Sequence, residues 1–183
     1  MKTIILATVF SLVASTGFTQ KVFTKNGTIS FFSKTDMEDI YAKNSQVMSV
    51  LNTATGEIQF SVLIKSFNFE KALMQEHFNE NYLESDKFPK SSFKGSVDDK
   101  SKVDFSKDGT YSVTVSGELE MHGVKNKVSA VPSSIIIKDG KIGGNSKFKV
   151  KLADYGIKVP NLVKDNISEI IEVTVACNYD QKM

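Results

Sequence analysis

Few side chains in this sequence of 183 residues could bind a metal or act as nucleophiles. His77 and Glu80 are three positions apart, a spacing that puts both on one face of a helix, where they can share a metal ion. The other candidate ligands, His122 and Cys177, follow at no regular spacing. A zinc centre needs three or four ligands, so we predict no metal site and no cofactor. An enzyme or metal-binding protein that uses His77, Glu80 and His122 is the alternative.

The signatures of covalent catalysis are missing from the sequence. No Gly-x-Ser-x-Gly segment occurs, and the glycines at 143 and 144 have no phosphate-loop pattern around them. Cys177 lies in an alternating apolar segment, which predicts a buried structural thiol. The carboxylates between positions 76 and 86 are most simply explained as a solvated helix face. We therefore expect no catalytic residues and no enzymatic activity.

The composition argues against a nucleic-acid partner. All 23 basic residues are lysines that are scattered along the chain, and the formal net charge is only +2. Nucleic-acid-binding surfaces need clustered positive charge and favour Arg, which does not occur in this sequence. Apolar residues make up 40% of the chain, enough for one domain with a substantial core.

The first 19 residues have the order of a secretory signal peptide. Lys2 is followed by an apolar run from Ile4 to Ala14 and then by small and polar residues as far as Gln20. This run is too short to cross a bilayer, which takes about 20 apolar residues. We expect a signal peptide at 1–19, cleaved near residues 17–20, and one mature domain at 20–183. The protein should be periplasmic or secreted, without a transmembrane segment.

Alternation of apolar and polar residues predicts strands along most of the mature chain. It is kept from Tyr111 to His122 and recurs, less regularly, in other segments. The remaining expected strands are 28–32, 47–51, 58–64, 91–97, 127–137, 148–152 and 171–179. An open sheet of this size would leave two long edges, so closure is favoured. We predict a mainly β fold, an eight-stranded antiparallel β-barrel.

One segment departs from the strand pattern. Apolar residues that recur every three to five positions predict a helix over about 68–83, with Asn68 as its N-cap. Pro89 cannot lie inside a helix, so the chain must return to an extended conformation before it. The apolar stripe of the helix, which includes Leu73 and Phe78, is expected to pack across the sheet as one covering α-helix.

Three segments resemble motifs of the YceI-like family of secreted lipid-binding proteins. They are the stretch from Phe78 to Phe93, the segment GELEMHGVKNKV at 117–128, and Asp154-Tyr155-Gly156-Ile157. The His-Gly-Val turn after an alternating strand is the most specific of these marks. Leu152 stands where the family commonly has an Arg. The resemblance implies a lipocalin-like barrel, periplasmic or secreted, that encloses a long amphiphile such as a polyisoprenoid.

The inward faces of the barrel are expected to line an apolar tunnel for a long-chain lipid or isoprenoid ligand. An eight-stranded barrel can be filled by its own side chains or hold one small ligand, and the mixture of Val, Ile and Phe leaves both open. The candidate lining residues are Phe60, Val62, Ile64, Phe78, Phe93, Val113, Val115, Leu119, Phe148, Val150, Val173 and Val175. We therefore expect a non-enzymatic binding or carrier protein for a long-chain apolar amphiphile.

N-terminal sequencing of the protein from its native host tests the expected export. The mature chain should begin between Phe18 and Lys21, because cleavage follows the small residues after the apolar run. A chain that starts at Lys2 or Thr3 would show that the segment is retained and would contradict the prediction.

Overall fold

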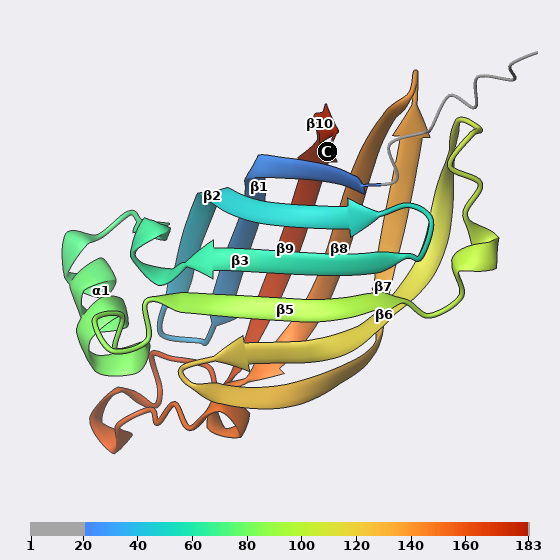
Figure 1. Cartoon of the computed structure of the whole chain (residues 1–183). Helices are drawn as coiled ribbons and strands as arrows, with labels where there is room; N and C mark the ends of the chain where they lie inside the picture. Colours follow the sequence, from blue (N-terminus) through green and yellow to red (C-terminus); the bar gives the residue numbers. More distant parts are fainter. Residues whose placement is uncertain (1–20, 183) are drawn as a thin grey trace, which may run out of the picture.

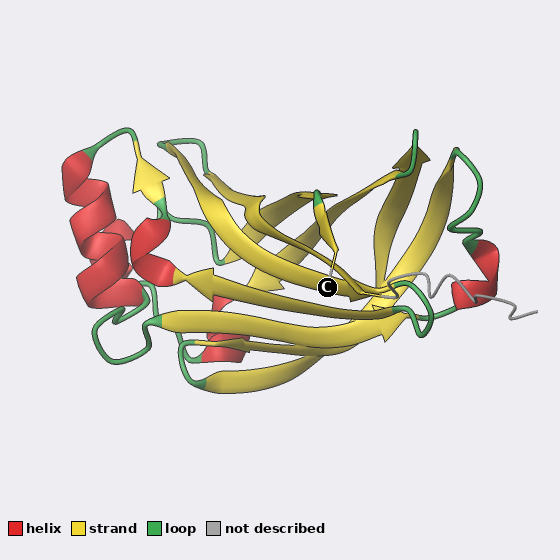
Figure 2. Cartoon of the chain, turned by 45° about the horizontal axis from the view of Figure 1, so that its top comes forward, coloured by secondary structure: helices red, strands yellow, loops and turns green. Residues whose placement is uncertain are grey.

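The structure is a computed structural model that describes residues 21–182, so the expected signal peptide lies outside the described residues. Eight long antiparallel strands form a closed barrel (Figure 1, Figure 2). They are β1 (Lys21–Lys34), β2 (Asp39–Asn52), β3 (Glu57–Leu63), β5 (Lys90–Val97), β6 (Gly109–Met121), β7 (Val124–Lys138), β8 (Lys141–Lys151) and β9 (Ile170–Tyr179). The strand β1 closes the ring because it pairs with both β2 and β9. The predicted eight-stranded antiparallel barrel is confirmed.

Short elements connect or extend the barrel strands. Two short strands of two residues each pair with barrel strands: β4 (Asn68–Phe69) pairs with β2, and β10 (Gln181–Lys182) pairs with β1. Single 3-10 turns are η1 (Ile64–Ser66), η3 (Lys100–Lys102), η4 (Leu152–Tyr155) and η5 (Asn161–Val163). Among the described helices, none has the length and apolar character needed to cross a membrane.

The closure of the barrel depends on a bulged region in β1. The residues Thr28–Phe32 pair with β9 on one side, while β1 also pairs with β2 along most of its length. The register with β2 shifts on both sides of Gly27. A Cβ atom at this position would lie 2.8 Å from the sulfur of Cys177. Glycine is therefore required where β1 approaches β9.

Two tight hairpins follow from turn residues in the sequence. His122 and Gly123 join β6 to β7 with φ angles of 53° and 74°. Asp139 and Gly140 join β7 to β8 with φ angles of 51° and 71°. Positive φ at both central residues is the type I′ geometry, whose twist matches that of the flanking strands.

The predicted helix over 68–83 is much too long. The α-helix α1 (Ala72–His77) is followed by a π-helical turn, η2 (Phe78–Tyr82), and the N-cap is Lys71 instead of Asn68. Asn68 is in β4 and pairs with Lys43 of β2. This tertiary pairing holds the start of the segment in an extended conformation. The helix covers one end of the barrel instead of lying across the sheet (Figure 1, Figure 2).

The apolar stripe expected on the helix is only partly buried. Leu73 is 61% exposed, so it does not belong to the core. Phe78, in η2, is half-buried and packs against aromatic rings from β1, β4 and the loop between η1 and β4. Its ring centroid lies 5.4 Å from that of Phe31, 5.6 Å from Phe67 and 5.0 Å from Phe69. This aromatic cluster attaches the helical segment to the end of the barrel.

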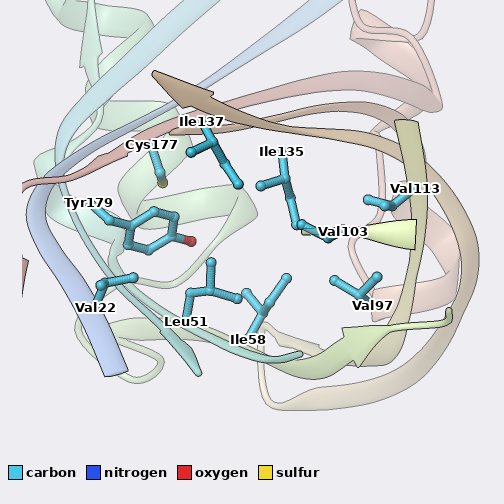
Figure 3. Packing of buried hydrophobic residues seen from close by; sticks show 10 residues of the cluster. All are labelled: Val22, Leu51, Ile58, Val97, Val103, Val113, Ile135, Ile137, Cys177 and Tyr179. Carbon is cyan, nitrogen blue, oxygen red and sulfur yellow. The ribbon is translucent and has the colours of Figure 1, made fainter. Parts of the chain in front are cut away.

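Aliphatic side chains fill the opposite end of the barrel. They point toward one another from the surrounding strands and from the loop that joins β5 to β6 (Figure 3). The buried members are Val22, Leu51, Ile58, Val97, Val103, Val113, Ile135, Ile137, Cys177 and Tyr179. The barrel therefore has one closed, packed end and one end covered by α1 and the aromatic cluster.

Truncation of Phe78 tests the role of the aromatic cluster in stability. Phe78→Ala should lower the free energy of unfolding by about 3 kcal/mol, the lower end of the range for a core aromatic, because the ring is only half-buried. Leu73→Ala, on the same segment but exposed, should change it by less than about 0.5 kcal/mol. Urea unfolding of both variants measures this. Equal effects of the two substitutions would contradict the prediction.

Candidate functional site

A cavity of about 490 Å³ lies inside the barrel, and the expected tunnel residues border it. They are Phe60 and Val62 on β3, Ile64 on η1, Phe78 on η2, Phe93 on β5, Val113, Val115 and Leu119 on β6, Phe148 and Val150 on β8, and Val173 and Val175 on β9. The structure thus brings all twelve together around one space. Of the two alternatives for the interior, a filled and a hollow barrel, the structure has the hollow one. Contact of these residues with a ligand stays a prediction.

The volume of the cavity indicates how large a ligand it can hold. A methylene group is about the size of a water molecule, whose share of liquid volume is about 30 Å³. The volume of about 490 Å³ therefore holds roughly 16 such groups. A single fatty-acid-like chain therefore fits in the cavity.

Sequence reasoning missed the aromatic side chains at the α1 end of the cavity. Phe31 of β1, Phe67 and Phe69 border the space together with Phe78. Phe31 belongs to the expected strand 28–32, to which no inward face is assigned, and Phe67 and Phe69 lie at the start of the apolar pattern that predicts a helix. Their shared location depends on the pairing of β4 with β2, which no local pattern indicates.

Buried polar groups at the closed end are neutral. The hydroxyl groups of Ser49 and Tyr179 are hydrogen-bonded at 3.0 Å. Burial raises the pKa of the Cys177 thiol to about 12, and it also raises the pKa of Tyr179 above its ordinary value. The prediction of a buried structural thiol is confirmed. These groups carry no charge at neutral pH and suit an apolar ligand.

The α1 end of the cavity carries a charged group. Glu38, which borders the cavity, accepts a hydrogen bond of 2.8 Å from the ammonium group of Lys71, just before α1. This bond lowers the pKa of the Glu38 carboxyl and raises that of Lys71. Asn166, near the start of β9, also borders the cavity and donates to Glu38 at 3.5 Å. Glu38 therefore links three chain segments at this end.

His122 connects the β6–β7 turn to two other segments. Its Nε2 lies 2.7 Å from a carboxylate oxygen of Glu84, and its Nδ1 lies 3.1 Å from the carbonyl oxygen of Tyr155. The ring of Phe88 packs against the imidazole with 4.8 Å between ring centroids. A Cβ atom at Gly123 would lie 2.5 Å from this phenyl ring. The His-Gly pair is thus a structural clasp in this protein.

The structure does not assemble the alternative metal site. Both nitrogen atoms of His122 are engaged by Glu84 and Tyr155, and His77 borders the cavity on α1. Across residues 21–182, no three His, Cys, Asp or Glu side chains gather closely enough to hold a metal ion. His77, Glu80 and His122 therefore do not form a metal centre in the described structure.

Thiol labelling tests the environment of the closed end. With its pKa near 12, the Cys177 thiol should have roughly 1000-fold less thiolate than an ordinary cysteine, and the native protein should react correspondingly slowly with a disulfide reagent near pH 8. The same thiol should react at the ordinary rate in urea. Rapid labelling of the native protein would show that this end is open to solvent.

Comparison with solved structures finds the same fold at low sequence identity. A polyisoprenoid-binding domain from Saccharophagus degradans, implicated in plant cell wall breakdown, superposes with a TM-score of 0.75 at 17% identity, covering 88% of this chain and 98% of that one. BcnA from Burkholderia cenocepacia gives a TM-score of 0.68 at 12% identity, covering 83% and 95%. The YceI protein of Campylobacter jejuni gives 0.55 at 16% identity, covering 99% and 94%. Identities this low establish a common fold only.

The sequence comparison assigns the chain to a family. A search of curated proteins returned no match. The family model described as YceI-like domain matches residues 9–179, which is most of the chain, and the resemblance carried by the His-Gly-Val turn agrees with it. This protein belongs to the YceI-like family.

Proposed function

We propose that this protein binds one long-chain apolar amphiphile, a polyisoprenoid or another lipid, inside its barrel. The observation that carries this proposal is the cavity of about 490 Å³, whose walls are mostly Val, Ile, Leu and Phe side chains. Cavities that hold small organic ligands are about 300–1,000 Å³ and mostly apolar. The description of the Saccharophagus degradans domain as polyisoprenoid-binding supports the same ligand class.

Burial of apolar surface can by itself supply the free energy for micromolar binding of a lipid chain. Burial of roughly 16 methylene-sized groups at about 0.8 kcal/mol each supplies about 13 kcal/mol. Association and ordering of the chain cost about 4–15 kcal/mol. When the cost is near its lower limit, the remainder corresponds to micromolar binding or tighter. Leu152, which stands where the family commonly has an Arg, also borders the cavity, so the ligand needs no charged anchor at this position.

We propose that the protein acts as a carrier or reservoir and not as an enzyme. The polar groups around Cys177 are neutral, and His122 is engaged in the clasp. These features, together with the mostly apolar lining of the cavity, support a binding role. The signal-like segment at 1–19 supports a location in the periplasm or outside the cell.

A substitution that fills the cavity tests the proposed function. Val115 borders the cavity from the middle of β6, so Val115→Phe should occupy space that the chain of the ligand needs. Mass spectrometry of an organic extract should find a lipid in the unmodified protein and none in the variant. Because the ring enters an existing cavity, the free energy of unfolding should fall by less than about 1 kcal/mol.

Ser112→Phe is the matched control for this experiment. Ser112 lies on the exposed outer face of the same strand, so the added ring should leave the lipid content unchanged. Normal lipid loading of a folded Val115→Phe protein would contradict a ligand in this cavity. An unmodified protein purified from its native host without any lipid would also contradict the proposal.

A further inference from the structure

The barrel wall is interrupted between β7 and β8. These strands pair only from Ser133–Ser146 to Lys138–Lys141. The segments Val124–Pro132 and Lys147–Lys151 pair with β6 and β9, respectively, but not with each other. We call the region between these two segments the seam.

Pro132 explains why the ladder stops where it does. The hydroxyl group of Ser146 donates a hydrogen bond of 3.1 Å to the carbonyl oxygen of Pro132, so this carbonyl faces β8. In an antiparallel strand, the N–H and C=O groups of one residue point to the same neighbour. Proline has no N–H group, so Pro132 cannot continue the ladder toward β8.

The backbone next to Pro132 is also turned away from β8. Ala130 has a φ angle of 51°, and its N–H donates a hydrogen bond of 2.9 Å to the hydroxyl oxygen of Ser116 on β6. The carbonyl oxygen of Val131 accepts a hydrogen bond of 3.1 Å from the hydroxyl group of Ser133. The hydroxyl group of Ser116 thus satisfies the N–H group of Ala130 on the side of β6, away from β8. The interruption of the ladder therefore follows from the local backbone structure of β7.

Two hollows lie next to the seam. One is the main cavity inside the barrel, and the other lies against β7, β8 and β9 where the ladder between β7 and β8 ends. Val131 of β7 and Phe148 of β8 border the main cavity on opposite edges of the seam. A hollow of about 400 Å³ lies against Pro132 and Lys147. Both spaces share five bordering residues, namely Ser133, Ser134, Asn145, Ser146 and Val175. Ser133 and Ser134 face opposite sides of the strand, so the wall is thin where the ladder ends.

Lysine side chains line both edges of the seam. Lys127 is exposed on β7, and exposed lysines alternate along β8 at 147, 149 and 151. Charged residues, especially Lys, are typical of strand edges that stay unpaired without attracting another chain. At its far end the seam is bounded by a hydrogen bond of 2.6 Å from the side-chain amide of Asn126 to the carbonyl oxygen of Asp154. The seam is therefore bounded at one end by the last ladder pair, Ser133–Ser146, and at the other by this hydrogen bond.

We propose that the seam is a lateral portal through which the chain of a single-chain amphiphile crosses the barrel wall. This inference rests on the proposed function. The alternative route, through the α1 end, requires the Lys71–Glu38 ion pair to break and the stacked rings around Phe78 to separate. Opening of the seam breaks no ladder hydrogen bond, although Val124 of β7 must separate from the apolar cluster that holds Val150 of β8. A chain longer than the cavity also has an exit there.

A covalent tether across the seam tests the portal. A variant with Ser129→Cys and Lys149→Cys places two exposed thiols on opposite edges, which a short bis-maleimide can join. Native Cys177 is buried and should stay unmodified. Stopped-flow fluorescence with cis-parinaric acid, a fatty acid of about the length that the cavity holds, gives the association and dissociation rates before and after the tether is made. Because the same protein is measured before and after tethering, any effect of the substitutions on folding is present in both measurements.

The matched control is a tether on the opposite wall. Gln59 and Lys94 are exposed, directly opposed residues on β3 and β5, where the ladder is continuous. We expect the seam tether to slow both rates by about tenfold or more with an unchanged dissociation constant, and the control tether to leave the rates unchanged. Unchanged rates in the seam-tethered protein would overturn the portal while leaving the proposed function intact. A protein that does not bind the fatty acid before tethering would overturn the portal for single-chain amphiphiles, whereas the proposed function is decided by the lipid extract.

Discussion

Closure of the sheet through β1 is the constraint on which the rest of the structure depends. Unpaired strand edges leave main-chain hydrogen-bonding groups exposed, and β1 removes both edges of the sheet because it pairs with β2 and β9. The close approach at Gly27 makes this double pairing possible. An eight-stranded barrel has an interior that side chains can just fill or that can hold one ligand. Closure thus creates the space, and the side chains decide how much of it stays empty.

The two ends of the barrel use different physical means to enclose the cavity. Close-packed aliphatic side chains and neutral buried hydroxyl and thiol groups fill one end. The other end has a short helix, four aromatic rings and the Glu38–Lys71 ion pair. An ion pair with one largely exposed partner, here Lys71, contributes little stability, so the rings provide most of the closure at this end. The seam between β7 and β8 is a third kind of boundary, because there the wall lacks ladder hydrogen bonds.

The family motifs meet at the clasp around His122. The imidazole of His122 contacts the Phe88 ring and the carbonyl oxygen of Tyr155, which come from two other segments of the chain. The Phe88 ring also lies close to Gly123. Each of these residue types has a structural reason: glycine permits the positive φ angle and the close phenyl ring, and histidine reaches two acceptors at once. The clasp also holds the β6–β7 turn near η4, beside the end of the seam. The motif therefore maintains the shape of the barrel around the cavity.

The alternation of apolar and polar residues determined the strands and their inward faces, because side chains of a strand point to opposite sides with a period of two. For this reason the ten strand residues assigned to the interior border the cavity, and Ile64 on η1 and Phe78 on η2 border it as well. Only the tertiary structure decided the length of the helix, because the pairing of Asn68 with β2 overrides the local helical pattern. It also decided that the barrel is hollow, because the empty volume depends on how the inward side chains of all the strands pack together. The strand expected over 127–137 contains Pro132, and only the order of strands in the closed sheet decided that the ladder between β7 and β8 ends there.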